Sequence, residues 1–146
     1  MEHILSVKEL GKIAKESSYK LKKLNTAEKN MMLASIKESL LSESSKILGA
    51  NEIDIKKGRE NNMSEGLIDR LLLTKDRIDA MAKSIDEVID FKDPVGKVLS
   101  MEENYAGLLI GKKTVPMGVI AIIYEARPNV TLDAAILSLK ASSAII

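Results

Sequence analysis

Apolar residues recur every three or four positions through the first two thirds of the chain, which is the spacing of amphipathic helices. A first helix is predicted from Ser6, because Ser6 and Glu9 form an S-x-x-E capping box ahead of an apolar stripe that runs from Val7 to Leu24 and includes Ile13. The clearest helical pattern follows Thr74, a candidate N-terminal cap. Its stripe consists of Ile78, Met81, Ala82, Ile85, Val88 and Ile89.

The region between these two helices is also predicted to be helical. A second helix should start at Asn25 or Thr26 and end at Gly49, which is a plausible C-terminal cap. The charged stretch 50–62 is either a short helix or a helical extension, and 64–71 has the pattern of one or two further turns. The N-terminal part of the chain is therefore predicted to form a helical layer.

The pattern changes after Gly96, where charges become rarer and β-branched residues more frequent. Apolar stretches on both sides of a polar turn at 102–104 predict a β-hairpin. Further on, the five apolar residues Val119–Ile123 lie between Gly118 and Pro128, which suits a strand covered on both faces in a parallel sheet. A buried helical turn is the alternative for this short apolar run.

A helix and a second strand are predicted to follow. Asn129 is a candidate N-cap, and Asp133 would lie in the first turn, where a negative charge favours the helix dipole. Ser142 and Ser143 should close this helix, and residues 144–146 have the composition of a second parallel strand. Strand, loop, helix and strand together make a βαβ unit, whose crossover is right-handed almost without exception.

We therefore predict an α/β fold: a helical N-terminal layer, a β-hairpin, and the first βαβ unit of a Rossmann-like parallel sheet. The predicted regions are 1–105, helical with the start of the hairpin, and 106–146, the hairpin return and the beginning of an incomplete nucleotide-binding domain. The last strand would have only three residues and an unpaired edge. We expect this chain to be the front portion of a longer protein.

Ligands of open parallel sheets bind at the carboxyl ends of the strands. Tyr124, Glu125, Arg127 and Asn129 follow the predicted strand at that position. Arginine suits phosphate and carboxylate, and a helix start favours anions. Each residue also has a structural alternative: Tyr124 can cover the strand end, Arg127 can pair with Glu125 or a neighbouring helix, and Asn129 can serve as the N-cap.

Composition narrows the possible chemistry. A net charge of +1 and few aromatic residues give no field or stacking platform for nucleic acid, and no apolar run is long enough to span a membrane. The N-terminus lacks a signal-peptide pattern, so we expect a cytoplasmic protein.

The chain has no cysteine, which excludes disulfides and a thiol nucleophile within it. The single histidine, His3, is expected to be solvated. It cannot form a histidine metal cluster by itself, and we do not expect it to take part in a Ser-His catalytic pair.

Two segments carry a specific resemblance. The segment 115–135, with Tyr-Glu-Ala-Arg-Pro-Asn at 124–129, resembles the γ-glutamyl phosphate reductase (glutamate-5-semialdehyde dehydrogenase) family. The segment 67–73, followed by Arg77-Ile78 and by 93–96, resembles the same family, and the likeness covers the whole chain in order.

The resemblance implies membership of the aldehyde dehydrogenase superfamily and a role in proline biosynthesis. A cysteine thiolate would attack γ-glutamyl phosphate and expel phosphate, and hydride from NADPH would then reduce the thioester to glutamate 5-semialdehyde. By position, Ile123, Tyr124 and Glu125 would flank the cofactor, and Arg127 and Asn129 would reach toward the acyl phosphate or the α-carboxylate. The resemblance also implies a homo-oligomer for the complete protein.

This chain departs from the family in lacking the nucleophilic cysteine, which lies further along in the family, as do the glycine-rich loop and most cofactor contacts. Serines 142 and 143 also stand where the family usually has a glycine. We therefore expect an inactive fragment with no catalytic residue of its own. Another aldehyde-dehydrogenase-like enzyme and a non-catalytic helical interaction protein that pairs through its hairpin are the alternatives.

Overall fold

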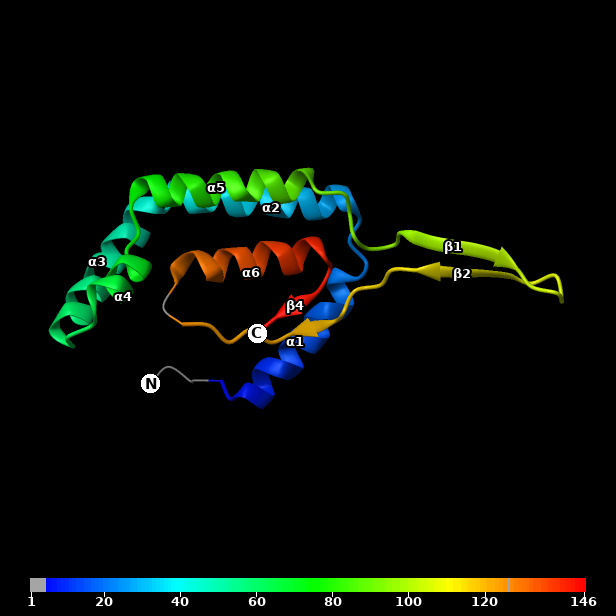
Figure 1. The fold of residues 1–146 in the computed structure, drawn as a ribbon, viewed down its shortest axis with the longest axis horizontal. Helices are drawn as coiled ribbons and strands as arrows, with labels where there is room; N and C mark the ends of the chain where they lie inside the picture. Colours follow the sequence, from blue (N-terminus) through cyan, green and yellow to red (C-terminus); the bar gives the residue numbers. More distant parts are fainter. Residues whose placement is uncertain (1–4, 126) are drawn as a thin grey trace.

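The computed structural model describes residues 5–125 and 127–146, which form a helical layer, a projecting hairpin and a small parallel sheet (Figure 1). His3 lies outside the described residues. Among the described residues, no helix has both the length and the apolar character that crossing a bilayer requires. The helices are α1 (Val7–Leu21), α2 (Thr26–Ser42), α3 (Ser44–Glu60), α4 (Glu65–Leu71), α5 (Lys75–Asp90) and α6 (Pro128–Lys140). The strands are β1 (Val98–Glu103), β2 (Leu109–Lys113), β3 (Val119–Ile120) and β4 (Ala144–Ile145).

Side-chain caps define where several helices begin. The predicted capping box of α1 is confirmed: the Glu9 amide donates to Ser6 Oγ at 3.3 Å, and the Ser6 amide donates to Glu9 Oε2 at 2.8 Å. Asn25 and Glu28 form the same reciprocal pair at the start of α2. Thr74 caps α5 as predicted, because its Oγ1 accepts a hydrogen bond from the Arg77 amide at 3.2 Å. These caps satisfy amide groups that have no partner within the helix.

The hydrophobic core lies where α2, α5 and α6 pack together. In Figure 1, α5 runs alongside α2, and α6 lies beneath them. The predicted stripe of α5 faces this core, with Ile85 fully buried. The core cluster consists of Leu33 from α2, Ile85 and Val88 from α5, and Ile136 and Leu139 from α6. The helical layer and the βαβ unit therefore share one core.

The prediction that the second helix ends at Gly49 is wrong. Helix α2 ends at Ser42, and α3 continues through Gly49 to Glu60, so the stretch 50–62 is mostly the second half of α3. The break lies in a serine-rich segment, where the Ser42 hydroxyl donates to the Ser39 carbonyl. Serine side chains compete for backbone groups in this way, whereas a single glycine inside a helix costs only about 1 kcal/mol.

Strands β1 and β2 form an antiparallel hairpin that projects from the body of the molecule (Figure 1). The hairpin is confirmed, but its turn lies at 104–108 and not at 102–104. Asn104 builds the turn, because its Oδ1 accepts from the amides of Ala106 and Leu108 at 2.9 and 3.0 Å. Gly107 adopts φ +76°, a conformation that glycine tolerates best. Asparagine and glycine therefore set the turn.

Strand β3 precedes α6 in the chain and β4 follows it. The two strands pair with each other in parallel, which confirms the βαβ unit. The Ile122 amide continues the pairing by donating to the Ile146 carbonyl at 3.0 Å. The expectation that Val119–Ile123 is covered on both faces is wrong in this chain: Ala121 is exposed and Ile123 is 100% exposed. Helix α1 packs against both short strands and α6 packs against β4, but the residues that follow β3 stay exposed.

The start of α6 also differs from the prediction. Pro128 is the first helical residue and Arg127 takes the N-cap position, so Asn129 lies inside the helix and Asp133 lies beyond its first turn. Proline suits the first helical position because its φ is preset and its missing N–H would have no partner there. Asn129 and Asp133 are four residues apart and therefore lie on the same face of α6.

The C-terminal end of α6 is fastened by a buried polar cluster. Lys29 of α2 is 1% exposed, and its Nζ lies 2.6 Å from the carboxylate of Asp93. The same Nζ donates to the Lys140 carbonyl and to Ser142 Oγ, both at 3.1 Å. Lys140 is also buried, and its Nζ donates to Asn30 Oδ1 and to a backbone carbonyl of α5, each at 2.8 Å. Among the described residues, no buried side-chain nitrogen or oxygen of the chain lacks a partner.

The cluster shifts the pKa of two of its members. Burial alone would raise the pKa of Asp93, but hydrogen bonds from Lys29, Thr26 and the Val95 amide, together with the charge of Lys29, lower it below the usual value. Burial lowers the pKa of Lys140, and the neighbouring Lys29 charge acts in the same direction against the attraction of Asp93. The lowered pKa of Asp93 means that its ionised form stabilises the fold.

Candidate functional site

The loop that leaves β3 carries the three residues predicted to contact the cofactor. Ile123 is 100% exposed, and Glu125 is also exposed. Tyr124 is about half exposed, and its hydroxyl forms a hydrogen bond with the hydroxyl of Thr131 in α6. Tyr124 therefore ties the loop to the helix, while Ile123 presents an apolar surface to solvent at the carboxyl end of the strand.

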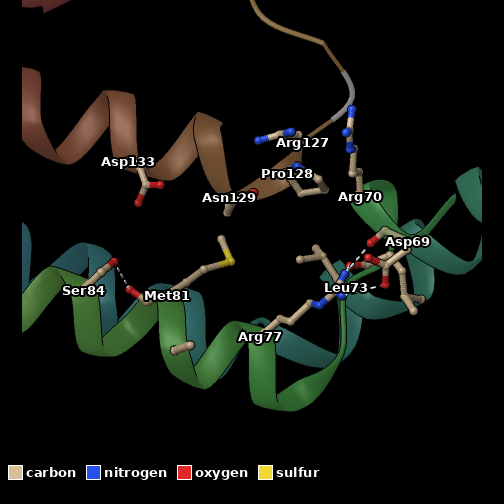
Figure 2. Close-up of a pocket in the computed structure, with 12 residues that line it drawn as sticks. Asp69, Arg70, Leu73, Arg77, Met81, Ser84, Arg127, Pro128, Asn129 and Asp133 are labelled. Atoms are coloured by element: carbon tan, nitrogen blue, oxygen red, sulfur yellow. Dashed lines mark hydrogen bonds and ion pairs between the residues drawn. The ribbon is translucent and has the colours of Figure 1, made fainter. Parts of the chain in front are cut away.

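The two residues predicted to contact substrate lie at the start of α6. Arg127 and Asn129 both line a pocket of about 500 Å³ between this helix end and the α4–α5 corner (Figure 2). Asp133, one helical turn after Asn129, lines the same pocket. The structure thus brings Arg127 and Asn129 to one pocket, while the exposed Ile123, Tyr124 and Glu125 precede it along the loop.

The opposite wall of the pocket comes from the helical layer. Asp69 and Arg70 at the end of α4 face the start of α6, and Arg77, Met81 and Ser84 follow along α5 (Figure 2). The other lining residues are Leu72, Leu73, Ala80 and Pro128. The pocket therefore combines charged residues from both regions of the chain with an apolar surface.

Arg77 holds the α4–α5 corner in shape. Its guanidinium donates to the backbone carbonyls of Asp69 and Leu72 and lies 2.8 Å from the Asp69 carboxylate. A second contact comes from α3, where the buried Asn51 donates to the Leu71 carbonyl at 2.8 Å and accepts from the Leu73 amide at 2.7 Å. The backbone around Arg70 is therefore fixed from two sides.

The remaining charges of the pocket have no ionic partner within the described residues. The alternative that Arg127 pairs with Glu125 is not observed there, and no ion pair joins Arg70, Arg127 or Asp133 to another described side chain. Arginine presents a planar fork of donors that matches a carboxylate or a phosphate oxygen pair. The pocket thus offers two guanidinium groups for an anion and one carboxylate for a cation.

Sequence reasoning did not place Arg70 or Asp133 in a site. Arg70 and Arg77 belong to one of the two segments that carried the family resemblance, but no local pattern joins them to Arg127, which is more than forty residues away. The shared core of α5 and α6 brings the two segments together. Among the described residues, no group of three or more histidine, aspartate or glutamate side chains is arranged to hold a metal ion.

Comparison with known proteins gives a consistent result. No protein-family model matches the chain. Over 135 residues it is 50% identical to the γ-glutamyl phosphate reductase of Dictyoglomus thermophilum, a match that covers 92% of this chain and 32% of that protein. It is also 50% identical to the enzyme of the same name from Yersinia pestis, over 94% of this chain and 33% of that protein.

Solved structures agree. The crystal structure of γ-glutamyl phosphate reductase from Thermotoga maritima matches with a TM-score of 0.90 and 44% identity, over 92% of this chain and 32% of that one. The enzyme of the same name from Saccharomyces cerevisiae matches with a TM-score of 0.91 and 32% identity, over 98% of this chain and 36% of that one. The predicted resemblance is confirmed, and the chain spans about a third of the length of these relatives.

Proposed function

We propose that this chain is part of a γ-glutamyl phosphate reductase that uses NADPH to reduce γ-glutamyl 5-phosphate to glutamate 5-semialdehyde in proline biosynthesis. The observation that carries the proposal is the 50% identity to reductases of that name over nearly the whole chain. The arrangement of Arg127 and Asn129 at a pocket at the end of the loop that follows β3 supports it, because an acyl phosphate is an anion and ligands of parallel sheets bind in the region beyond the carboxyl ends of the strands. We place the complete enzyme in the cytoplasm.

The residues that follow β3 are of chemical types that can contact a nicotinamide cofactor. Ile123 offers an exposed apolar surface for a ring, and Tyr124 and Glu125 offer polar groups beside it. NADPH supplies hydride when bound, and the role of these side chains would be to position its nicotinamide next to the substrate carbonyl. Arg127 and Asn129 would then orient the substrate from the start of α6.

The chain contributes binding groups but no nucleophile, because it contains no cysteine. In the proposed reaction a thiolate from another part of the complete enzyme attacks the acyl phosphate, with departure of phosphate. This chain by itself should therefore show no reductase activity.

The hairpin supports the proposal that the complete enzyme is a homo-oligomer. Its apolar residues are exposed by more than half, among them Leu99, Leu109 and Ile110. An exposed apolar hairpin is a surface that another chain can cover by packing or by strand addition. The same surface would serve the alternative of a non-catalytic interaction protein, so the enzymatic proposal needs a direct test.

The test is a chimera in which this chain replaces the matching third of the Thermotoga maritima enzyme. The purified chimera is assayed in the reverse direction with glutamate 5-semialdehyde, phosphate and NADP, alongside the parent enzyme and this chain alone. We expect turnover from the chimera and none from the isolated chain. A folded chimera that turns over simple aldehydes only would indicate a different aldehyde-dehydrogenase-like enzyme, and one without any turnover would refute the proposed function.

A further inference from the structure

We infer that the pocket between α6 and the α4–α5 corner recognises the α-amino acid end of the substrate, with arginines for the α-carboxylate and Asp133 for the α-ammonium. This inference rests on the proposed function and deepens it. A zwitterion requires one cationic and one anionic partner, and the pocket supplies both from side chains that have no ionic partner among the described residues. A phosphate site would require only the positive groups.

The carboxylate is assigned to Arg70 of α4 and Arg127 at the start of α6, which both line the pocket. Arg77 lies in the same pocket but is bonded to two carbonyls and the Asp69 carboxylate, so it is a positioning residue. Two guanidinium groups on separate elements can bind one carboxylate only while the α4–α5 corner stays close to the start of α6. Recognition of the carboxylate would therefore depend on the packing of α5 against α6.

The ammonium is assigned to Asp133, with the Asn129 amide oxygen as a second acceptor. Both side chains lie on the same face of α6, and Asp133 is partly buried. In Figure 2 the Asp133 carboxylate points into the space between α6 and α5. A carboxylate that is partly removed from water binds an ammonium group more strongly than an exposed one does.

The chain direction orders the two ends of the substrate. Residues 123–125, proposed to lie by the nicotinamide, leave the strand first, and Arg127 and Asn129 follow at the start of α6, which then runs back toward β4 (Figure 1). The reacting acyl group would lie by the loop, and the amino acid end would lie in the pocket. A volume of about 500 Å³ and the apolar side chains of Leu73 and Met81 accommodate the methylene groups between them.

The test measures binding to this chain by the chemical shifts of backbone amides in labelled protein, with three probes at millimolar concentration. L-glutamate carries both groups, glutarate lacks the ammonium, and 4-aminobutyrate lacks the α-carboxylate. We expect L-glutamate to shift amides in the ranges 69–84 and 127–133 and to bind about tenfold more tightly than either analogue, because each lost charged contact costs roughly 1.5 kcal/mol.

Two variants separate the roles of the charges. Asp133→Asn should weaken L-glutamate about tenfold and leave glutarate unchanged, whereas Arg70→Gln should weaken both and leave 4-aminobutyrate unchanged. Arg59→Gln and Asp54→Asn, exposed on α3 and outside the pocket, are matched controls that should change nothing. Equal binding of all three probes, shifts confined to other regions, or no shifts at all would overturn the inference.

The chimera distinguishes this outcome from failure of the proposed function. If the chimera reduces and oxidises its substrate but the chain shows no discrimination among the probes, the reaction stands and the zwitterion site is wrong. In the chimera, Asp133→Asn should raise KM for glutamate 5-semialdehyde about tenfold with little change in kcat. An unchanged KM would count against the site even in an active enzyme.

Discussion

At the C-terminal end of α6, Lys140 and Ser142 belong to a buried network with Lys29 and Asp93, whereas at the N-terminal end Arg127 and Asp133 face an open pocket. Both ends bring charges from distant parts of the chain together. They differ in pairing: every polar group of the buried network has a partner, and no ion pair involves the charges at the pocket among the described residues.

The contrast separates charges that hold the fold from charges that are available to a ligand. A buried ion without a partner is strongly unfavourable, so the C-terminal cluster has to be complete in the folded chain. Charges at a pocket mouth keep their hydration and can remain unpaired until a ligand arrives. Substitutions at the two ends should therefore affect different properties, stability at one end and binding at the other.

The largest effect on stability is expected for Lys29→Met. The change removes the partner of Asp93 and the donor to the Lys140 carbonyl and to Ser142. Breaking a buried ion pair from one side costs about 3–5 kcal/mol, and the partial exposure of Asp93 places this case at the lower end. Urea unfolding followed by circular dichroism measures the loss in the free energy of unfolding.

Lys37→Met is the matched control, because Lys37 lies in α2 like Lys29. Lys37 pairs at 2.6 Å with Asp86 of α5 at the surface of the protein. A half-exposed pair of this kind contributes about 0.2–1 kcal/mol. Similar losses for the two variants would mean that burial does not distinguish these ion pairs.

A smaller loss is expected for Asn51→Ala, which tests the support beneath the pocket. The Leu71 carbonyl and the Leu73 amide would lose their side-chain partner, at a cost of about 2 kcal/mol in the free energy of unfolding. Asn61→Ala at the exposed end of α3 should change stability by less than about 0.5 kcal/mol. If Asn51→Ala behaves like Asn61→Ala in urea unfolding, Asn51 does not anchor the α4–α5 corner.

Acid should weaken the buried cluster through Asp93. Because its pKa is lower in the folded chain than in the unfolded chain, its contribution is present above the unfolded value, about 3.9, and is lost as the pH falls through the folded value. Unfolding free energies measured between about pH 6 and about pH 2 should fall less steeply for Asp93→Asn than for the unchanged protein. Parallel curves for the two proteins would contradict a stabilising role of the ionised carboxylate.

The smallest effect on stability is expected at the open end. Arg127→Ala and Asp133→Asn each remove a charge that has no ionic partner among the described residues, so the free energy of unfolding should change by no more than about 0.5 kcal/mol. Thermal or urea unfolding of each variant measures this directly. A loss of more than about 1 kcal/mol would show that these charges serve the fold, which would remove the contrast between the two ends.

Much of the fold follows from local patterns, because each such element carries its own signal. The stripe of α5 faces the core as predicted, and the capping residues Ser6 and Thr74 mark their helices correctly. The prediction that Ser142 and Ser143 close α6 is confirmed, because the helix ends at Lys140 and Ser142 adopts a left-handed φ of +53°. The placement of the 105/106 boundary stays a prediction, as do the contacts of Ile123, Tyr124 and Glu125 with a cofactor.

The sequence-based predictions are wrong where two local signals compete, or where residues far away in the sequence determine whether a side chain is buried. Gly49 is a typical helix end but lies in a strong helix, and Asn129 is a good cap but follows a proline that starts the helix first. Ile13 belongs to a regular stripe yet is half exposed, because in this chain little packs against that part of α1. The burial of Lys29 depends on partners more than sixty residues away, which no local spacing reveals.

Ser142 illustrates how one position can serve two requirements that favour different residues. Its φ of +53° suits glycine, but a glycine there would take away the hydroxyl that accepts a hydrogen bond from the ammonium of Lys29. The main chain would be more relaxed, and the lysine would be left short of an acceptor in a place that water does not reach. A stabilisation programme that replaces left-handed residues by glycine according to backbone geometry alone would choose the wrong residue here.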